Sequence, residues 1–547
     1  MAKRYLVTSA LPYANGVVHL GHIAGAYLPA DVYARWRRLR GDDVIYVCGN
    51  DDHGVPTTIA AEKEGLTPRE LTDKYYNKNI EAFRGLDFSF DIYSRTSVPE
   101  HAKNSQQFFL NLHKAGYIVE KEGDQFYCEQ CKRYLPDRYV LGTCPSCGTG
   151  GARGDQCENC GKWYETLALK DPYCRDCKSP PVVRKTRHWY FELEKFQEPL
   201  KEWLAGRKGW RDNVVNFAKG WLGEGLRSRA ITRDIAWGVP VPLEEAKGKV
   251  LYVWFDAPIG YLTFTQQYFR EKGEPEKWRD YWQSDDCDLI HFIGKDNIVF
   301  HALVWPAMLM GQENFILPSN IPANEFLTFG GEKGSKTRGN AITVPEYLEK
   351  FPADPLRYYL TINAPEAKDA NFTWEDFAAK NNDDLADVFG NLYHRIQTFA
   401  HRYFKGRMPA GVSADAPVMK RIAETREKVD AHLEAFRIRD SLREVLNLGR
   451  WGNKFFDDEK PWVLRKEDKE RCAGAIAQCL ELCAALAIFT HPYMPHTAAR
   501  LWNMLGLAGE TAPTPDAWNR LGSPLLAEGH ELNKPDILFK KIETVPL

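Results

Sequence analysis

The 547-residue sequence contains no uninterrupted run of about 18 apolar residues, the length that a membrane-spanning helix requires. Its N-terminus, MAKRYLVTSALPYANG, has only a short apolar stretch that proline and asparagine interrupt, which is unlike a secretory signal peptide. The sequence therefore predicts a cytosolic protein without a membrane anchor.

Neither sign of charge is in excess, since 72 Lys and Arg residues stand against 74 Asp and Glu residues and the formal net charge is -2. This balance excludes a global basic field for attracting nucleic acid, so an RNA partner would have to bind through local patches. Solenoid-type repeats and low-complexity tracts are also missing. The composition, 44% hydrophobic and 13% aromatic, is typical of a well-packed globular protein, and the length predicts about two to four domains.

Cysteine, in contrast, is concentrated in one part of the chain. Of 13 cysteines, eight lie between positions 128 and 177, and all eight belong to C-x-x-C pairs. In a reducing compartment this spacing favours metal binding over disulfide formation. The pairs are Cys128/Cys131, Cys144/Cys147, Cys157/Cys160 and Cys174/Cys177.

Two C-x-x-C turns complete one tetrahedral Cys₄ zinc site, so these thiols predict two zinc ions. We expect a nested arrangement, in which the inner pairs (144/147 and 157/160) hold one ion and the outer pairs (128/131 and 174/177) hold the other. Consecutive pairing of neighbouring turns is the alternative. Because a closed Cys₄ site leaves no open position for a substrate, both sites are predicted to be structural.

An alternation of strands and helices begins at the N-terminus. Residues 4–10 (RYLVTSA) predict a strand, residues 22–40 a helix that Gly41 ends, and residues 43–49 (DVIYVCG) a second strand. This order implies a parallel pair of strands joined by a right-handed crossover, as at the start of a Rossmann-like nucleotide-binding fold.

The same alternation resumes much later in the chain. Strands are predicted at 249–255, 288–294 and 324–329, and a helix at 297–311. The segment 116–230, which contains the cysteine pairs, is then an insertion between two halves of one α/β domain.

After about residue 370, predicted helices replace predicted strands. Apolar residues recur with a helical period over 384–404, 418–436, 438–456 and 471–489, which predicts an all-α C-terminal domain. The predicted fold is a Rossmann-like α/β domain that is split by a zinc-knuckle insertion and followed by a helical bundle. The predicted boundaries are 1–115 (first half), 116–230 (insertion), 231–325 (second half), 326–383 (basic loop and junction) and 384–547 (bundle).

The loop between the first strand and the first helix has the composition of a phosphate-binding site. It places His19 and His22 beside Gly16 and Gly21. A helix N-terminus has free N–H groups and a partial positive charge, glycine permits close approach to a ligand, and imidazoles donate hydrogen bonds to phosphate oxygens. We therefore predict that this loop binds phosphate; the alternative is that both histidines are ordinary polar residues at a helix start.

Two short segments resemble motifs of a known enzyme class. HLGH (19–22) resembles the HIGH motif of class I aminoacyl-tRNA synthetases, and KGSKT (333–337) resembles their KMSKS motif. The second segment departs from the pattern, because Gly334 stands where methionine is usual and Thr337 replaces the last serine, while both lysines remain. The flanking segments ALPYANG, GNDDHG, YVWFDAPIGY, HFIGKDN and FHALVWPAML resemble the methionyl-tRNA synthetase family along the whole chain.

The resemblance implies a two-step reaction. The carboxylate of methionine attacks the α-phosphate of ATP and expels pyrophosphate, and the adenylate then esterifies the 3′-terminal adenosine of tRNA(Met), for initiation and elongation of protein synthesis. Since a carboxylate is already ionised at pH 7, the first step needs alignment and neutralisation of phosphate charge rather than a general base. By resemblance, the catalytic residues are His19, His22, Lys333 and Lys336, Mg²⁺ accompanies ATP, and the further ATP-binding residues are Asn15, Gly21, Arg233, Gly294, Asp296 and Thr337.

The resemblance also implies an amino-acid pocket. Asp51 is expected to pair with the substrate ammonium group, and the Tyr261 hydroxyl to offer the sulfur a hydrogen bond. An apolar, aromatic wall suits a thioether, because sulfur is a weak acceptor that packs well against ring edges. The other expected pocket residues are Leu11, Tyr13, Trp254, Ala257, Pro258, Phe300, His301 and Trp305, with core packing as the alternative for Phe300 and Trp305.

The helical bundle resembles the anticodon-binding domain of the same family. Asn391, Arg395 and Trp462 match positions that contact the CAU anticodon, and an exposed aromatic ring can stack on an unstacked base. The alternative for Trp462 is a buried aromatic residue at a helix cap. The chain shows no extra dimerising domain after the bundle, so a monomer is expected.

Other functions explain parts of the sequence. The cysteine enzyme of the same class has zinc in its amino-acid pocket, and no cysteine cluster maps there. The leucine, isoleucine and valine enzymes carry a large editing insertion, for which the segment 116–230 is too short. A zinc-ribbon nucleic-acid-binding protein without activity would explain the cysteines but not the histidine and lysine motifs.

Overall fold

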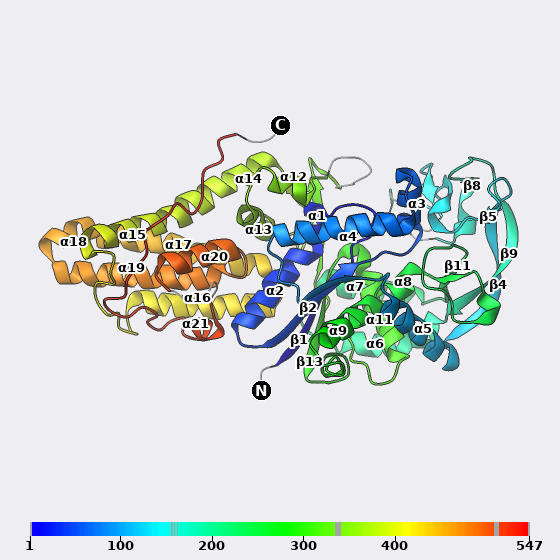
Figure 1. The fold of residues 1–547 in the computed structure, drawn as a ribbon, viewed down its shortest axis with the longest axis horizontal. Coiled ribbons are helices and arrows are strands. Elements are labelled where there is room, and N and C mark those ends of the chain that lie inside the picture. Colours follow the sequence, from blue (N-terminus) through cyan, green and yellow to red (C-terminus); the bar gives the residue numbers. More distant parts are fainter. Residues whose placement is uncertain are drawn as a thin grey trace.

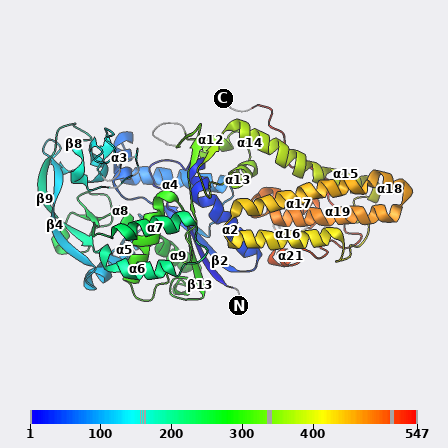
Figure 2. The ribbon, with the colours of Figure 1, turned by 180° about the vertical axis from the view of Figure 1, so that it is seen from behind.

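The computed structural model describes residues 3–154, 157, 159–160, 162, 164–333, 341–507 and 513–544. The molecule is elongated, with a bundle of helices at one end and an α/β domain that carries the cysteine-rich insertion at the other (Figures 1 and 2). In Figure 1 the cyan insertion lies beyond the blue and green α/β domain, and the yellow to red helices form the opposite end.

A five-stranded parallel sheet forms the centre of the α/β domain. Three of its strands precede the insertion in the sequence and two follow it. The first strand of the chain lies between these two sets and pairs with one strand of each. In open parallel sheets, ligands bind where the strand order reverses in this way, at the carboxyl ends of the strands. The prediction of a Rossmann-like domain split by an insertion is therefore confirmed. The strand order is β14 (Ala323–Asn324), β13 (Cys287–Gly294), β1 (Arg4–Ser9), β2 (Asp43–Asn50) and β3 (Ile92–Arg95).

The helix predicted at residues 22–40 starts slightly earlier and contains a π-helical turn. It consists of α1 (Leu20–His22), the π-helical turn η1 (Ile23–Tyr27) and α2 (Leu28–Leu39). Gly41 follows with a φ of +86°, a conformation that favours glycine and ends the helix as predicted. A second π-helical turn, η7 (Phe300–Val304), precedes α11 (Trp305–Met310). Single π-turns are rare and frequently lie at functional sites.

Two strand predictions are wrong in part. Over residues 249–255 the structure has only the short β12 (Val250–Leu251), which pairs with β11 (Thr232–Arg233) outside the main sheet, and then the helix α8 (Val253–Asp256). A short buried apolar run has the same pattern in a strand and in a helix, so periodicity could not separate them. The segment 324–329 is divided, because Asn324 ends β14 whereas β15 (Leu327–Phe329) joins β16 (Glu332–Lys333) and β17 (Ala370–Phe372) in a separate sheet.

The insertion is built on a long antiparallel ribbon of β4 (Ile118–Cys128) and β9 (Val182–Phe191). A three-stranded sheet that carries the inner C-x-x-C turns lies beside the ribbon, at the end of the molecule farthest from the helical bundle (Figure 1). Its smaller elements are β5 (Arg133–Tyr134), η2 (Asp137–Tyr139), β6 (Val140–Thr143), β7 (Ala152–Arg153), β8 (Lys170–Cys174), α6 (Gln197–Ala205), α7 (Asp212–Glu224) and β10 (Arg229–Ala230).

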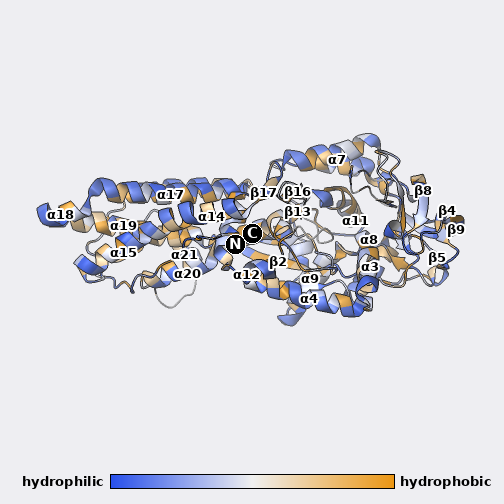
Figure 3. Ribbon diagram, turned by 90° about the horizontal axis from the view of Figure 1, so that it is seen from above, coloured by the Kyte–Doolittle hydropathy of each residue, from blue (hydrophilic) through white to orange (hydrophobic). Residues whose placement is uncertain are grey.

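The predicted C-terminal helices are all present. They are η8 (Asn381–Gly390) continued by α15 (Asn391–Phe404), then α16 (Pro417–Glu434), α17 (Ile438–Glu459) and α19 (Lys469–Thr490). The α17 helix, on the outside of the bundle, is drawn mainly in the hydrophilic colours in Figure 3. The other helices of the chain are α3 (Val55–Glu64), α4 (Pro68–Gly85), α5 (Pro99–Lys114), α9 (Ile259–Glu271), α10 (Arg279–Trp282), α12 (Val344–Leu348), α13 (Ala353–Ile362), α14 (Trp374–Lys380), α18 (Pro461–Glu467), α20 (Pro495–Met504) and α21 (Pro515–Asn519).

The α19 helix is the core helix of the bundle. In the described part of the chain it is the one helix that is long and apolar enough to cross a membrane by length and composition, and 83% of its apolar window is buried inside the protein. A helix that is apolar on all sides is expected when neighbouring helices surround it.

A buried ion cluster joins the α/β domain to the helical bundle. The Asp31 carboxylate on α2 accepts hydrogen bonds from Arg35 at 2.9 Å and from Arg357 on α13 at 2.6 Å. Arg357 also donates to the backbone carbonyls of Leu86 and Tyr493, which lie on the two sides of the junction. Burial alone would raise the pKa of Asp31, but the two guanidinium groups outweigh this effect and lower it below its usual value.

Candidate active site and associated clusters

A cavity of about 360 Å³ lies at the carboxyl ends of β1 and β13, where the strand order reverses. Residues from both halves of the α/β domain line it, together with residues beside β15. The predicted site residues that it brings together are Leu11, Tyr13, His19, Gly21, His22, Asp51, Trp254, Ala257, Pro258, Tyr261, Gly294, Asp296, Phe300 and His301.

The loops that follow β1 and β2 hold each other by backbone hydrogen bonds. The Asp51 N–H donates to the Pro12 carbonyl at 2.9 Å, and the Ala14 N–H donates to the Asp51 carbonyl at 2.9 Å. Because the two strands are parallel neighbours, their loops leave the sheet at the same edge. This places Asp51 against the loop that carries Tyr13.

His19 and His22 form a close pair at the start of α1, with ring centroids 3.7 Å apart and the ring planes tilted by 30°. The Gly21 N–H donates to Nδ1 of His19 at 3.1 Å, and the His19 N–H donates to Nδ1 of His22 at 3.2 Å. Since each Nδ1 accepts a hydrogen bond, a neutral ring carries its proton on Nε2. The helix N-terminus therefore fixes both imidazoles as Nε2–H donors, the form that a phosphate oxygen requires.

The second motif begins next to this histidine pair. A Cβ atom at Gly21 would lie 2.9 Å from the His19 ring and 3.7 Å from the Leu327 carbonyl oxygen, so α1 and β15 are in close contact there. On the adjacent β16, the backbone of Lys333 pairs with Thr328. Tertiary structure thus brings the start of the lysine motif to the histidines, while Lys336 and Thr337 lie outside the described residues.

Aromatic side chains form one wall of the cavity. The Trp254 indole N–H donates to the Tyr13 hydroxyl at 2.5 Å, and its ring centroid lies 4.3 Å from that of Phe300. Trp254 comes from α8 and Phe300 from η7, so the segment that was mispredicted as a strand supplies a pocket residue from a helix.

A hydrogen-bonded pair, Tyr261 and His301, lies at the base of this wall. Nδ1 of His301 lies 3.1 Å from the Asn297 carbonyl and must donate to it, so Nε2, 2.9 Å from the Tyr261 oxygen, accepts the Tyr261 proton. Burial keeps the ring neutral by lowering the pKa of His301 to about 4. The Tyr261 proton is therefore directed at His301, which differs from the expected hydrogen bond to a substrate sulfur.

Asp51 is a buried carboxylate with an unpaired oxygen. It is 3% exposed, and its Oδ1 has no hydrogen-bond partner within the described residues. Burial, and then the nearby carboxylates of Asp256 and Asp52, raise its pKa well above the usual value. Such a group at the edge of a cavity is a suitable partner for a small cation such as an ammonium group.

A buried histidine–aspartate cluster behind Asp51 was not identified from the sequence. The Asp256 carboxylate lies 2.7 Å from Nδ1 of His53 and 3.2 Å from Nε2 of His101, and all three side chains are buried. These residues come from three separate segments, so no local pattern could have shown that they meet. The cluster holds the turn after β2 that positions Asp51.

Three predicted residues lie away from the cavity. Trp305 is 0% exposed and its ring lies near those of Phe108 and Trp282, the environment that the core alternative describes. Arg233 lines a smaller neighbouring cavity, with its guanidinium carbon 3.8 Å from the Tyr252 ring centroid. Asn15 lies in the loop after β1 and does not line the cavity.

The insertion contributes a lining residue that sequence reasoning missed. Arg138, in η2 between two C-x-x-C turns, lines both the main cavity and the smaller one. Its position depends on how the insertion folds back over the α/β domain, and no spacing in the sequence reports that.

Comparisons with known proteins identify the family of this chain. A family model described as "tRNA synthetases class I (M)" matches residues 5–397, and one described as "Anticodon binding domain of methionyl tRNA ligase" matches residues 408–545. The chain belongs to the methionyl-tRNA synthetase family. Its curated relatives include the methionine–tRNA ligases of Porphyromonas gingivalis, 47% identical over 99% of this chain and 79% of the relative, and of Pyrococcus furiosus, 45% identical over 98% and 75%.

Solved structures of the family share the fold. The methionyl-tRNA synthetase of Mycobacterium tuberculosis bound by methionyl-adenylate superposes with a TM-score of 0.81 at 26% identity, covering 98% of this chain and 100% of that one. The free form of the same enzyme gives a TM-score of 0.74 at 26% identity, covering 100% and 99%.

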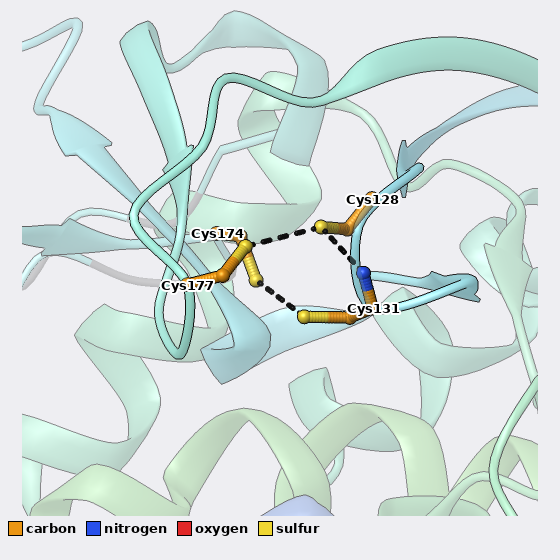
Figure 4. A group of neighbouring side chains, drawn as sticks. All are labelled: Cys128, Cys131, Cys174 and Cys177. Atoms are coloured by element: carbon orange, nitrogen blue, oxygen red, sulfur yellow. Dashed lines mark hydrogen bonds between the residues drawn. The ribbon is translucent and has the colours of Figure 1, made fainter.

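The eight cysteines of this family member form two groups in the insertion, one from the outer pairs and one from the inner pairs. This is the nested grouping rather than the consecutive one. In the outer group the sulfurs of Cys128 and Cys177 are 3.3 Å apart and those of Cys131 and Cys174 are 3.8 Å apart (Figure 4). In the inner group the corresponding separations, 144 to 160 and 147 to 157, are 3.9 and 3.7 Å.

These separations fit zinc rather than disulfides. Four thiolates around Zn²⁺ at about 2.3 Å stand about 3.8 Å apart, whereas a disulfide requires about 2.05 Å. Hydrogen bonding to Thr149 lowers the pKa of Cys147 to about 6, and hydrogen bonding to Ser179 lowers that of Cys177 to about 6. Burial and the neighbouring thiols raise the pKa of Cys131 to about 12, so one thiol of the outer group ionises more readily than another. A lowered pKa favours the thiolate, which is the form that binds metal.

The predicted anticodon residues lie on the helical bundle, far from the cavity. Trp462 is 43% exposed, so the alternative of a buried helix-cap residue is wrong. Its ring lies 6.0 Å from Phe456, and the guanidinium carbon of Arg395 lies 4.7 Å from the Phe456 centroid. Asn391 is exposed one turn before Arg395 on α15. The 22-residue α17 alone separates this end from the α/β domain by about 33 Å.

Proposed function

We propose that this chain activates L-methionine with ATP and transfers it to the 3′ end of tRNA(Met). The observation that carries the proposal is one cavity in which an aromatic pocket continues into the His19–His22 pair. The pocket contains the buried Asp51, whose Oδ1 has no hydrogen-bond partner among the described residues. The first part suits an amino acid with an apolar side chain, and the second suits phosphate.

In the first step the substrate carboxylate attacks the α-phosphorus, an oxygen–phosphorus bond forms, and the bond to pyrophosphate breaks. No protein base is required, because the attacking group is already ionised. The Nε2–H groups of His19 and His22 stabilise the charge that develops on the phosphate oxygens, while Lys333 and Lys336 neutralise the leaving pyrophosphate. Mg²⁺ enters with ATP. Asp296, Gly21 and Gly294 contact the nucleotide, and Arg233, Asn15 and Thr337 assist from the edge of the site.

Asp51 orients the substrate by pairing with its ammonium group. Because burial and two nearby carboxylates hold the pKa of Asp51 high, ionisation of this carboxyl group is favoured only when a cation arrives. Binding of the ammonium group therefore releases a proton from Asp51. The pairing fixes the carboxylate of the substrate at the phosphate end of the cavity.

The side chain of methionine packs against the aromatic wall of the cavity. Trp254 and Phe300 pack on the thioether, and Leu11, Ala257 and Pro258 complete the apolar surface. The Tyr261 oxygen, whose proton is directed at His301, keeps a fixed position at the base of the pocket. Such a pocket separates near-isosteres by about 1–3 kcal/mol.

In the second step a ribose hydroxyl of the tRNA 3′ end attacks the adenylate carbonyl, and AMP leaves. The helical bundle binds the anticodon through Asn391, Arg395 and Trp462. Two structural zinc ions hold the insertion in the shape that brings Arg138 to the cavity. We further propose a cytoplasmic, monomeric enzyme.

The test is amino-acid-dependent exchange of pyrophosphate into ATP with each of the twenty amino acids. We expect exchange with methionine. Exchange with cysteine instead would indicate the cysteine enzyme of the same class, and no exchange with any amino acid would indicate an inactive zinc-ribbon binding protein.

A further inference from the structure

The tip of the helical bundle carries aromatic groups beyond the predicted anticodon residues. Among the exposed large apolar side chains of the described residues, three are aromatic: Phe217, Tyr403 and Trp462. Two of these three lie at the tip, Tyr403 at the end of α15 with 36% exposure and Trp462 on α18 with 43%. Figure 1 shows α15 and α18 next to each other at this end of the molecule.

Arg465 links Tyr403 to Trp462 at the surface of the tip, and two buried rings link them underneath. Arg465, one turn after Trp462 on α18, places its guanidinium carbon 4.6 Å from the Tyr403 ring centroid. Phe399 lies 4.6 Å from Tyr403 and 6.3 Å from Phe456, which in turn lies 6.0 Å from Trp462. We call Tyr403, Trp462 and Arg465 the tip patch; Phe399 and Phe456 are buried beneath it.

Arg465 differs from Arg395 and Arg471 because it has no carboxylate partner among the described residues. Arg395 pairs with Asp457, and Arg471 pairs with Glu459 at 3.3 Å. Within the described part of the chain, Arg465 forms no ion pair, and its Nε is buried without a hydrogen-bond partner. A guanidinium group that is held on a ring and lacks an acid is preorganised for an external anion. Arg402, with its guanidinium carbon 5.4 Å from the Tyr403 ring, adds a second cation.

We propose that Tyr403 and Arg465 bind a loop nucleotide of the tRNA next to the base that stacks on Trp462. Arg465 contacts the phosphate of this nucleotide, and the exposed edge of the Tyr403 ring contacts its base or ribose. Aromatic rings alternating with arginines are the chemistry that binds single-stranded RNA, whereas an acidic protein segment would use the cations alone. The inference rests on the proposed function, and Tyr403 lies between the ranges of the two family models, 5–397 and 408–545.

The experiment measures binding of a synthetic anticodon stem-loop of tRNA(Met) to the full chain by fluorescence anisotropy at several salt concentrations. Tyr403→Ala is expected to weaken binding about tenfold, the scale for loss of one aromatic contact to a base, and Tyr403→Phe to keep the affinity. Arg465→Gln is expected to weaken binding and to reduce the slope of log K against log salt by about 0.7, the contribution of one phosphate contact on a single strand.

A matched control is Arg443→Gln, an exposed arginine of α17 outside the tip patch, which should leave affinity and slope unchanged. Methionine-dependent pyrophosphate exchange is measured for each variant as a check of folding, because the cavity is at the other end of the molecule, and Arg443→Gln should leave this exchange unchanged. Trp462→Ala serves as the reference for anticodon binding.

The outcomes separate this inference from the proposed function. If Trp462→Ala weakens binding while Tyr403→Ala and Arg465→Gln bind normally, the inference is overturned and the proposed function stands. If none of the three variants weakens binding, the inference and the anticodon role of Trp462 are both overturned, whereas the exchange assay alone decides methionine activation. If Arg465→Gln changes the salt slope but Tyr403→Ala binds normally, the patch acts as a cation site alone, and the proposed nucleotide contact is overturned.

Discussion

Replacement of Asp51 by asparagine tests the central charge of the proposed site. The two side chains have the same shape, so Asp51→Asn removes a charge without opening a cavity. A buried ammonium group that loses its carboxylate partner is destabilised by about 3–5 kcal/mol, and hydrogen bonding to the asparagine oxygen recovers part of this. Taking the lower limit of about 3 kcal/mol, we expect kcat/KM for methionine in pyrophosphate exchange to fall by about 150-fold, with little change in KM for ATP.

The same substitution should stabilise the free enzyme, with a defined pH dependence. The pKa of Asp51 is raised in the folded chain, so above the unfolded value near 3.8 the folded state keeps a proton that the unfolded state has released. The stability that this proton contributes is lost as the pH rises towards the folded pKa. Asparagine does not titrate, so the difference in Tm between Asp51→Asn and the unmodified chain should grow from about pH 4 upwards.

Proton release provides an independent check. If methionine binding ionises Asp51, the binding heat measured by titration calorimetry should depend on the ionisation enthalpy of the buffer, and Asp51→Asn should abolish this dependence. An asparagine variant with normal kcat/KM for methionine, or with a Tm difference that stays constant with pH, would refute the role assigned to this carboxylate.

Three further predictions concern other parts of the structure. His22→Ala should slow adenylate formation, because the transition state loses about 3 kcal/mol of stabilisation, and should leave methionine affinity nearly unchanged. Single-turnover kinetics measures the rate of adenylate formation. A large loss of methionine affinity would contradict the phosphate role. Metal analysis should find two zinc ions per chain. Cys144→Ser should remove the ion of the inner cysteine group, and Cys128→Ser should remove that of the outer group, so each variant should retain one ion. A single ion in the unmodified chain would show that one of the two cysteine groups does not bind zinc. Arg357→Leu should lower the free energy of unfolding by about 3–5 kcal/mol, because Asp31 loses one of its two buried cations, and Asp31→Asn in the same chain should recover part of the loss in a denaturant titration.

The sequence predicts those features of the protein that depend only on residues close together in the chain. The C-x-x-C turns, the loop that places His19 and His22 at a helix start, and the helical period of the C-terminal domain each depend on residues that are close in the chain. The division of one parallel sheet by an insertion followed from the order of strands and helices. The strand predicted at 249–255 is wrong in part, because a short buried apolar run has no period that distinguishes a strand from a helix.

The sequence by itself therefore determined which groups the protein has for binding phosphate, metal and RNA, and the order of its domains. Only the tertiary structure decided which of these groups meet. It set the nested grouping of the thiols, placed β15 beside α1, brought Arg138 to the cavity, and left Trp305 in the core. It also fixed protonation where distant segments meet, since the direction of the Tyr261 proton depends on His301 and the raised pKa of Asp51 depends in part on Asp256. The Nε2–H forms of His19 and His22, in contrast, follow from backbone N–H groups within three residues. Hydrogen bonds and charge interactions act over a few ångströms in space, and distance along the chain does not report that separation.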